Sequence, residues 1–151
     1  MKYSQAEIQR IFIIRLEHGE ILHEEIKKFV RKKDIKAGAM IVVGGSEKGS
    51  KLIVDPEDGE ETSISPMEYV LKEVHEMSGT ETIFQDEEGK AIVHVLAANG
   101  RKNSTITGCI REGVKVWEVM EIVLIELQFT EAIRVLEEKT GLKLLNPEGL
   151  N

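Results

Sequence analysis

The sequence predicts an α+β fold, a mainly antiparallel β-sheet flanked by helices. Two β-like runs, residues 91–98 and 104–111, lie on either side of Asn99-Gly100, a pair that favours hairpin turns because both residues tolerate positive φ. A longer β-like run, residues 114–128, is apolar on both of its faces. Helical spacing of apolar residues occurs in residues 21–35 and 130–140.

The composition indicates one soluble domain spanning residues 1–151. Apolar residues make up 41% of the chain and charged residues 31%, which is enough for one core beneath a charged surface. Internal repeats and linkers are absent from the sequence. Glu and Lys are plentiful whereas Asn and Gln are scarce, a bias typical of thermophiles.

Charge and cysteine content narrow the functional classes. The net charge of −7 argues against DNA binding through this chain alone, because an acidic surface repels phosphates. Cys109 is the only cysteine, so an intramolecular disulfide is impossible and a reducing cytoplasm is expected. Neither a signal peptide nor an apolar run of the ~20 residues that span a bilayer is present, so no membrane association is expected.

The first half of the chain predicts a strand, a helix and two further strands. Residues 10–17 are rich in β-formers, and residues 21–35 then place apolar side chains on one face of an amphipathic helix. Residues 39–43 form an apolar strand that Gly44-Gly45 ends or bulges. Residues 51–54 predict a short strand, and the acidic residues 55–65 an exposed loop.

The second half predicts the central hairpin and a closing helix. Residues 65–74 are ambiguous, because Ser65 and Glu68 have the spacing of a helix capping box while the apolar residues also fit a strand. Residues 82–84 predict a strand before the turn at 86–89. After the hairpin and residues 114–128, a helix over 130–140 is predicted to end at Gly141.

The two-sided run at residues 114–128 predicts self-association. Met120, Ile122 and Leu124 lie on one face, and Val123 and Ile125 on the other, so both faces need to be covered. Two amphipathic helices can cover one face of a sheet of this size. Because the chain is short, a second subunit is the simplest cover for the other face, and a homo-oligomer is expected.

Several phrases together resemble the PPC (plants and prokaryotes conserved) domain, a family of undefined function, and they run in order through most of the chain. They are His75-Glu76, Thr82-Ile83-Phe84, 86–89, Val93-His94, Gly100-Arg101, Thr107 to Arg111 with Gly113, Trp117, Glu121 to Leu124, and Thr140 to Leu145. The resemblance implies an antiparallel sheet flanked by helices, a homotrimer, and an archaeal or bacterial source. Prokaryotic members are often labelled as DNA-binding, and in plants the domain sits beside AT-hooks. The AT-hook core is absent from this sequence, so that label rests on association.

A metal site is the first chemical candidate. Many prokaryotic members carry a His-x-His pair on the strand that corresponds to residues 91–98, where alternation places both imidazoles on one face. In this sequence His94 stands at the first position but Leu96 at the second. His75 and Cys109 would complete a zinc site with His94 if the fold brings the three together, and this would make a zinc-dependent enzyme. Alternatively, His94 and Cys109 are ordinary core residues.

Three further candidates concern Cys109, the hairpin and residues 114–128. Cys109 is also a candidate nucleophile, because Arg111 and a histidine nearby would lower the pKa of its thiol. Arg101, Asn103 and Arg111 are candidate ligands for an anion. Trp117 and Glu121 are candidate interface residues, the latter as the partner of a subunit's arginine or as part of a pocket between subunits.

The sequence therefore favours a non-enzymatic, homotrimeric module that binds a protein or a small ligand, without a certain cofactor. One alternative is the zinc-dependent enzyme or ligand-binding protein that uses His75, His94 and Cys109. The other is direct DNA binding through the basic helix, where Lys27, Lys28 and Arg31-Lys32-Lys33 cluster.

Overall fold

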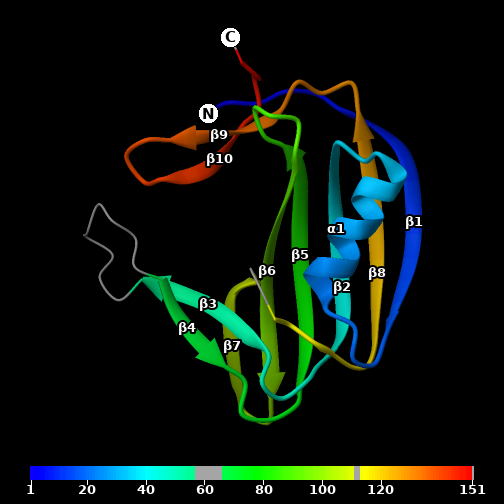
Figure 1. The fold of residues 1–151 in the computed structure, drawn as a ribbon, viewed down its shortest axis with the longest axis vertical. Coiled ribbons are helices and arrows are strands. Elements are labelled where there is room, and N and C mark those ends of the chain that lie inside the picture. The colour runs from blue at the N-terminus through cyan, green and yellow to red at the C-terminus, as the bar shows by residue number, and fades with distance from the viewer. Residues whose placement is uncertain (57–65, 111–112, 151) are drawn as a thin grey trace.

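A computed structural model describes residues 1–56, 66–110 and 113–150, and it contains one large antiparallel sheet, one helix and a separate hairpin (Figure 1). The helix is α1 (Leu22–Lys33). The strands are β1 (Glu7–Glu17), β2 (Ala37–Ser46), β3 (Lys51–Pro56), β4 (Pro66–Val70), β5 (His75–Gln85), β6 (Ala91–Arg101), β7 (Ser104–Ile110), β8 (Val116–Gln128), β9 (Ile133–Glu137) and β10 (Leu142–Asn146). The α+β class and the antiparallel sheet are confirmed.

Eight strands form the sheet in the order β1-β8-β2-β5-β6-β7-β3-β4. All pairings between these strands are antiparallel. The central strands β8, β2, β5 and β6 are 10 to 13 residues long and give the sheet its rigid middle. Residues 65–74, which fitted either a helix or a strand, contain β4, an edge strand of the sheet.

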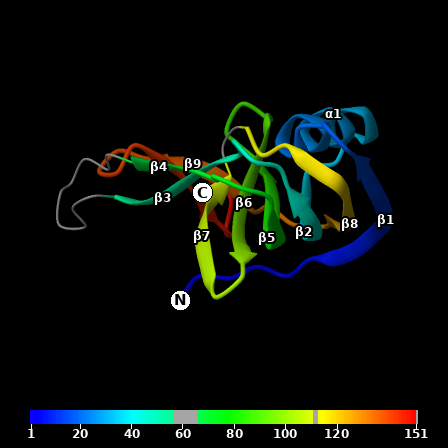
Figure 2. The same cartoon turned by 90° about the horizontal axis from the view of Figure 1, so that it is seen from below.

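The helix α1 covers one face of the sheet and buries the core. Its buried residues Leu22, Ile26 and Val30 pack with residues such as Met40 and Leu124 from the central strands. Basic residues in its last turn favour the negative end of the helix dipole, and Asp34 ends the helix in the left-handed conformation. Figure 2 shows the helix on one side of the sheet only. We call this side the helix face.

Only one helix occurs in residues 1–56, 66–110 and 113–150, so the sheet is not flanked by several helices as expected. The predicted helix over 130–140 is wrong, because β9 and β10 pair as a two-stranded antiparallel hairpin. Gly141 (φ 68°) lies in the hairpin turn, not at a helix end. The α1 helix, with 12 residues and many charges, is too short and too polar to cross a membrane.

The central hairpin is confirmed, but its turn lies further along the chain. Asn99 is fully buried inside β6, where its Oδ1 accepts a hydrogen bond from the Ser46 hydroxyl (2.8 Å). The two-residue turn is Lys102-Asn103, and Lys102 adopts the positive φ (53°). The Gly44-Gly45 step is confirmed as a bulge, because the register of β2 with β8 shifts there.

The β9–β10 hairpin is attached to the end of β5 (Figure 1). Arg134 on β9 donates one hydrogen bond to Thr82 Oγ1 (2.9 Å) and one to the carbonyl of Lys143 (3.1 Å). The Lys143 ammonium in turn lies 2.7 Å from the carboxylate of Asp86, which follows β5. This ion pair raises the pKa of Lys143 and lowers that of Asp86.

Candidate functional site

The face of the sheet opposite α1 carries an exposed apolar surface. Strand alternation places on it large apolar side chains from four strands, and we call this surface the open face. Its exposed members are Ile11, Ile13, Ile41, Val43, Leu96 and Val123. Ile13 is 79% exposed and Ile41 52%. Contiguous exposed apolar surface is typical of interaction sites.

Two of the three predicted metal ligands lie together on the open face. Cys109 on β7 pairs in register with Leu96, and His94 lies two residues before Leu96 on β6. The Sγ atom of Cys109 is 3.7 Å from Nε2 of His94, a contact between neighbouring strands. The hairpin thus brings together the imidazole and the only thiol of the chain.

His75, the third predicted ligand, is not part of this pair. It begins β5, seven residues before Thr82, which is the residue that pairs with His94. Seven strand residues span roughly 23 Å. The alternation of β5 also turns the buried His75 toward the helix face, where its Nδ1 lies 2.8 Å from the carbonyl oxygen of Glu73.

The described residues do not fit a zinc site within one chain. Zinc sites take three or four protein ligands, whereas the hairpin presents one imidazole and one thiol, with Leu96 where a second imidazole would stand. No cluster of three or more His, Cys, Asp or Glu side chains suited to a metal exists in residues 1–56, 66–110 and 113–150.

The predicted anion ligands lie at the far end of the hairpin. Arg101 ends β6, and its Nη1 donates a hydrogen bond to the carbonyl of Val74 (2.7 Å). Asn103 is exposed in the turn. A shallow depression of about 540 Å³ lies between Arg101, Trp117 and the start of β5. Arg111 falls outside the described residues.

The two predicted interface residues differ in their surroundings. Trp117 is half-buried at the bulge of β8, packed so closely on Gly45 that a Cβ there would lie 2.7 Å from the indole ring. Glu121 is exposed on the open face, in register with Arg15 of β1 and Val43 of β2. Arg15 pairs instead with Glu17 (3.2 Å), so the carboxylate of Glu121 is available to a partner.

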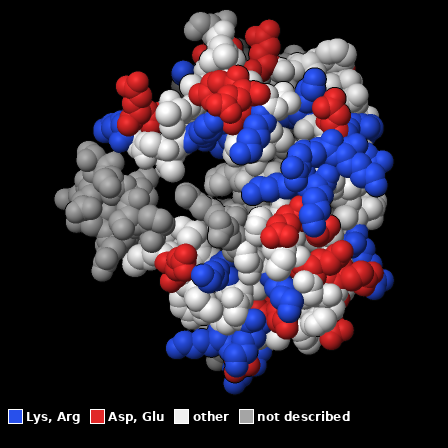
Figure 3. Space-filling model, in the orientation of Figure 1, with Lys and Arg blue, Asp and Glu red and all other residues white. Residues whose placement is uncertain are grey.

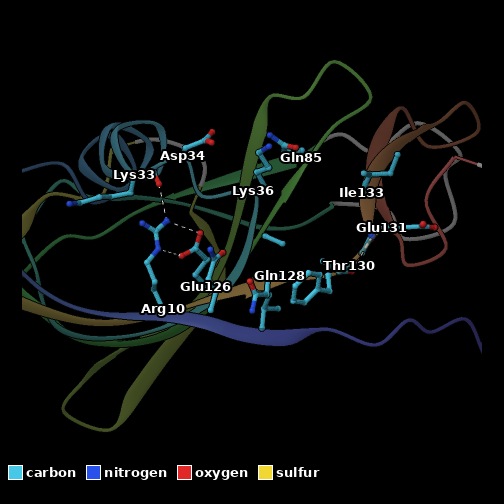
Figure 4. A pocket seen from close by; sticks show the side chains of 15 residues that line it. Arg10, Lys33, Asp34, Lys36, Gln85, Glu126, Gln128, Thr130, Glu131 and Ile133 are labelled. Carbon is cyan, nitrogen blue, oxygen red and sulfur yellow. Dashed lines mark hydrogen bonds and ion pairs between the residues drawn. The ribbon is translucent and has the colours of Figure 1, made fainter.

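A polar cleft that the sequence did not predict opens beside the ends of β1, β2 and β8 (Figure 4). It has a volume of about 630 Å³ and is floored by the ion pair of Arg10 with the buried Glu126. Arg10 Nη2 also donates to Glu126 Oε1 (2.8 Å) and to the carbonyl of Lys33 (2.9 Å). A bulge between Ile8 and Ile11 aims Arg10 at Glu126 from β1.

The helix face holds one buried acid without a partner. Glu81 on β5 lies between Met40 and Val95 and is 2% exposed. Neither of its carboxylate oxygens has a hydrogen-bond partner, and burial raises its pKa to about 8. The strand predicted at residues 82–84 stops one residue short of Glu81, and the burial of Glu81 depends on which face of the sheet α1 covers.

Comparison with known proteins decides the family. The Plants and Prokaryotes Conserved (PCC) domain, the same family that the sequence resembles, matches residues 3–128. The chain belongs to the PCC domain family. The β9–β10 hairpin lies beyond the matched part of this PCC domain.

Solved structures share the fold of this PCC domain. A plant- and prokaryote-conserved protein from Pyrococcus horikoshii has 24% sequence identity and a TM-score of 0.81, with 99% of this chain and all of that chain covered. A metal-containing protein from Archaeoglobus fulgidus has 22% identity and the same TM-score, over 97% of this chain and 99% of that one. A Bacteroides thetaiotaomicron protein, provisionally named DNA-binding, has 15% identity, a TM-score of 0.75 and coverage of 96% and 99%. No match was found among the curated proteins.

Proposed function

We propose that this PCC domain is a homotrimeric binding module that assembles through its open face. The observation that carries the proposal is the exposure of Ile13, Ile41 and Leu96 on the sheet face that α1 does not cover. Leaving apolar side chains of this size in water costs roughly 1.5–3 kcal/mol each, and another copy of the chain would remove them from water.

A second copy suits this surface better than an unrelated protein. The open face carries both Arg15 and Glu121, so a symmetry-related copy offers opposite charges around the same apolar centre. The number of three subunits comes from the family resemblance. The mass in solution, measured by light scattering at micromolar concentration, is expected to be about three times 17.0 kDa; a monomer would refute the proposal.

We propose that the module acts by binding rather than by catalysis, because the sequence offers no complete catalytic set. It works in the cytoplasm, where its single thiol stays reduced. Its partner is a protein or a small ligand.

A metal site is the second candidate function, favoured by the 3.7 Å contact between the thiol and the imidazole. The fold relative from Archaeoglobus fulgidus is named metal-containing. In a homotrimer, ligands from another copy would have to replace the missing imidazole at Leu96. Elemental analysis of the purified protein before and after zinc addition tests this candidate, and the absence of bound zinc in both samples would exclude it.

DNA binding through α1 is the remaining candidate, supported by the basic residues of the helix and by the name of the Bacteroides relative. It predicts an affinity that falls steeply with salt, because phosphate contacts release counterions. Fluorescence anisotropy with a labelled duplex at low salt measures it, and an unchanged anisotropy would exclude it.

A further inference from the structure

A groove runs between α1 and the start of β6, on the helix face of the sheet. It has a volume of about 560 Å³, within the range of roughly 300–1,000 Å³ typical of small-molecule sites. We call it the helix groove. It lies apart from the open face, so assembly through that face leaves it accessible.

The floor of the helix groove is apolar. Val30 and Ile35 line it from the helix side, and Val93 lines it from β6. Val30 and Ile35 belong to the core, so this floor is held by packing and does not need a ligand to form. A hydrocarbon chain laid on this floor would lose contact with water without disturbing the core.

The rim of the helix groove is cationic. Lys27 and Arg31 border it from successive turns of α1, and Lys90 borders it from the turn before β6. None of the three makes an ion pair with a carboxylate among the described residues. Of the residues that the structure describes, Asp34 is the only acidic one that lines the groove. Figure 3 shows Lys and Arg side chains gathered over α1.

The charge of this rim is opposite in sign to the net charge of the protein. The chain carries a net charge of −7, yet the groove brings together three cations and one anion. Cations above an apolar floor attract an anionic group and provide a dry surface for the rest of the same molecule. A nucleic acid would use the cations but leave the recessed floor empty.

We propose that the helix groove binds a small amphipathic anion, an alkyl chain that ends in a carboxylate or a phosphate. The alkyl chain lies on Val30, Ile35 and Val93, and the anionic group lies between Lys27, Arg31 and Lys90. This names a ligand class for the binding module and in that sense rests on the proposed function. The groove is complete within one chain, so a monomeric protein that binds the anion would refute the assembly but not the groove.

The test is calorimetric titration of the whole chain with decanoate and with decyl phosphate, both below their micelle concentrations. At least one of them is expected to bind, and the tighter of the two identifies the preferred head group. Acetate, which lacks the chain, and decyl maltoside, which lacks the charge, are each expected to bind at least tenfold more weakly. Nuclear magnetic resonance shifts should concentrate in residues 27–35 and 89–93.

A matched pair of charge variants decides the site. The triple variant K27E/R31E/K90E is expected to lose at least tenfold in affinity. The triple variant K32E/K48E/K72E changes the net charge equally at exposed positions outside the groove and should bind as the natural chain does. Circular dichroism confirms that both variants are folded.

Three results would overturn the proposal. One is the failure of both alkyl anions to bind. Another is an equal loss of affinity in the two triple variants, which would indicate unspecific attraction. The third is that a DNA duplex binds and loses its affinity only in K27E/R31E/K90E while the alkyl anions do not bind, which would make the rim a phosphate-backbone surface.

Discussion

The thiol of Cys109 lies 3.7 Å from Nε2 of His94 on the open face, and Leu96, two residues after His94, is the register partner of Cys109. The two donors are diagonal neighbours on adjacent strands, a distance that side chains bridge in antiparallel sheets. The geometry therefore supplies two of the three ligands that a zinc site needs, and the alkyl side chain of Leu96 occupies the position of the third.

Replacing Leu96 by histidine should create zinc binding. The new imidazole would stand on the same face as His94 and opposite Cys109, which supplies a third ligand. Competition with a chromophoric chelator should show at least tenfold tighter zinc binding by Leu96→His than by the natural chain. Ile41→His places an imidazole on the same face without the thiol and should not gain affinity. Equal affinities of Leu96→His and Ile41→His would contradict the geometry.

Glu81 should make the protein less stable as the pH rises from acid to neutral. Its pKa is about 8 in the folded chain and about 4.5 when it is exposed. Below pH 4.5 both states are protonated, and between 4.5 and 8 only the unfolded state releases the proton. The free energy of unfolding therefore decreases in this window, by at most about 1.4 kcal/mol per pH unit, and the loss is complete above pH 8.

The isosteric variant Glu81→Gln isolates this effect. Urea unfolding at pH 5, 6, 7 and 8 should show that its stability, relative to the natural chain, increases steadily with pH. Glu76→Gln, an exposed position on the same strand, should follow the natural chain at every pH. Parallel curves for Glu81→Gln and the natural chain would mean that Glu81 ionises freely in the folded state.

The central sheet was predictable because the apolar pattern of its strands is visible in the sequence itself. The apolar runs at β2, β6 and β8 are long enough to define strands without knowledge of their neighbours. The position of the hairpin turn was missed by three residues, because Asn99 is held in the strand by the Ser46 hydroxyl from another part of the chain. A turn signal of two residues does not reveal such a tertiary hydrogen bond.

The C-terminal hairpin was mistaken for a helix for a related reason. Residues 130–140 hold only three apolar residues at helical spacing, which also fit a short strand. Arg134 donates a hydrogen bond to Thr82 of the distant β5, and this tertiary contact favours the strand.

The candidate site was half predictable. Alternation places His94 and Cys109 on one face, but His75 could be excluded only once the register of β5 with β6 was known. A cleft between elements that are distant in the sequence has no local sequence pattern that predicts it.

The Arg10–Glu126 ion pair should stabilise the end of the sheet mainly by avoiding a lone buried charge. Glu126 is buried, so Arg10→Met leaves its carboxylate without a cation and should lower the urea midpoint. The double variant Arg10→Met/Glu126→Leu removes both charges and should recover much of the loss. A double variant less stable than Arg10→Met would show instead that the pair itself holds the cleft together.

The open face should be the surface through which the chain self-associates. Ile13→Lys and Ile41→Lys each place a charge on it, which a second copy could bury only at a large desolvation cost. Light scattering should show monomers for both variants, with circular dichroism unchanged, since the side chains are exposed in the single chain. Leu145→Lys changes an exposed apolar residue on β10, outside the eight-stranded sheet, and should keep the mass of the natural protein. If Leu145→Lys dissociates the assembly while Ile13→Lys and Ile41→Lys do not, the subunits meet through the C-terminal hairpin and the open face awaits a different partner.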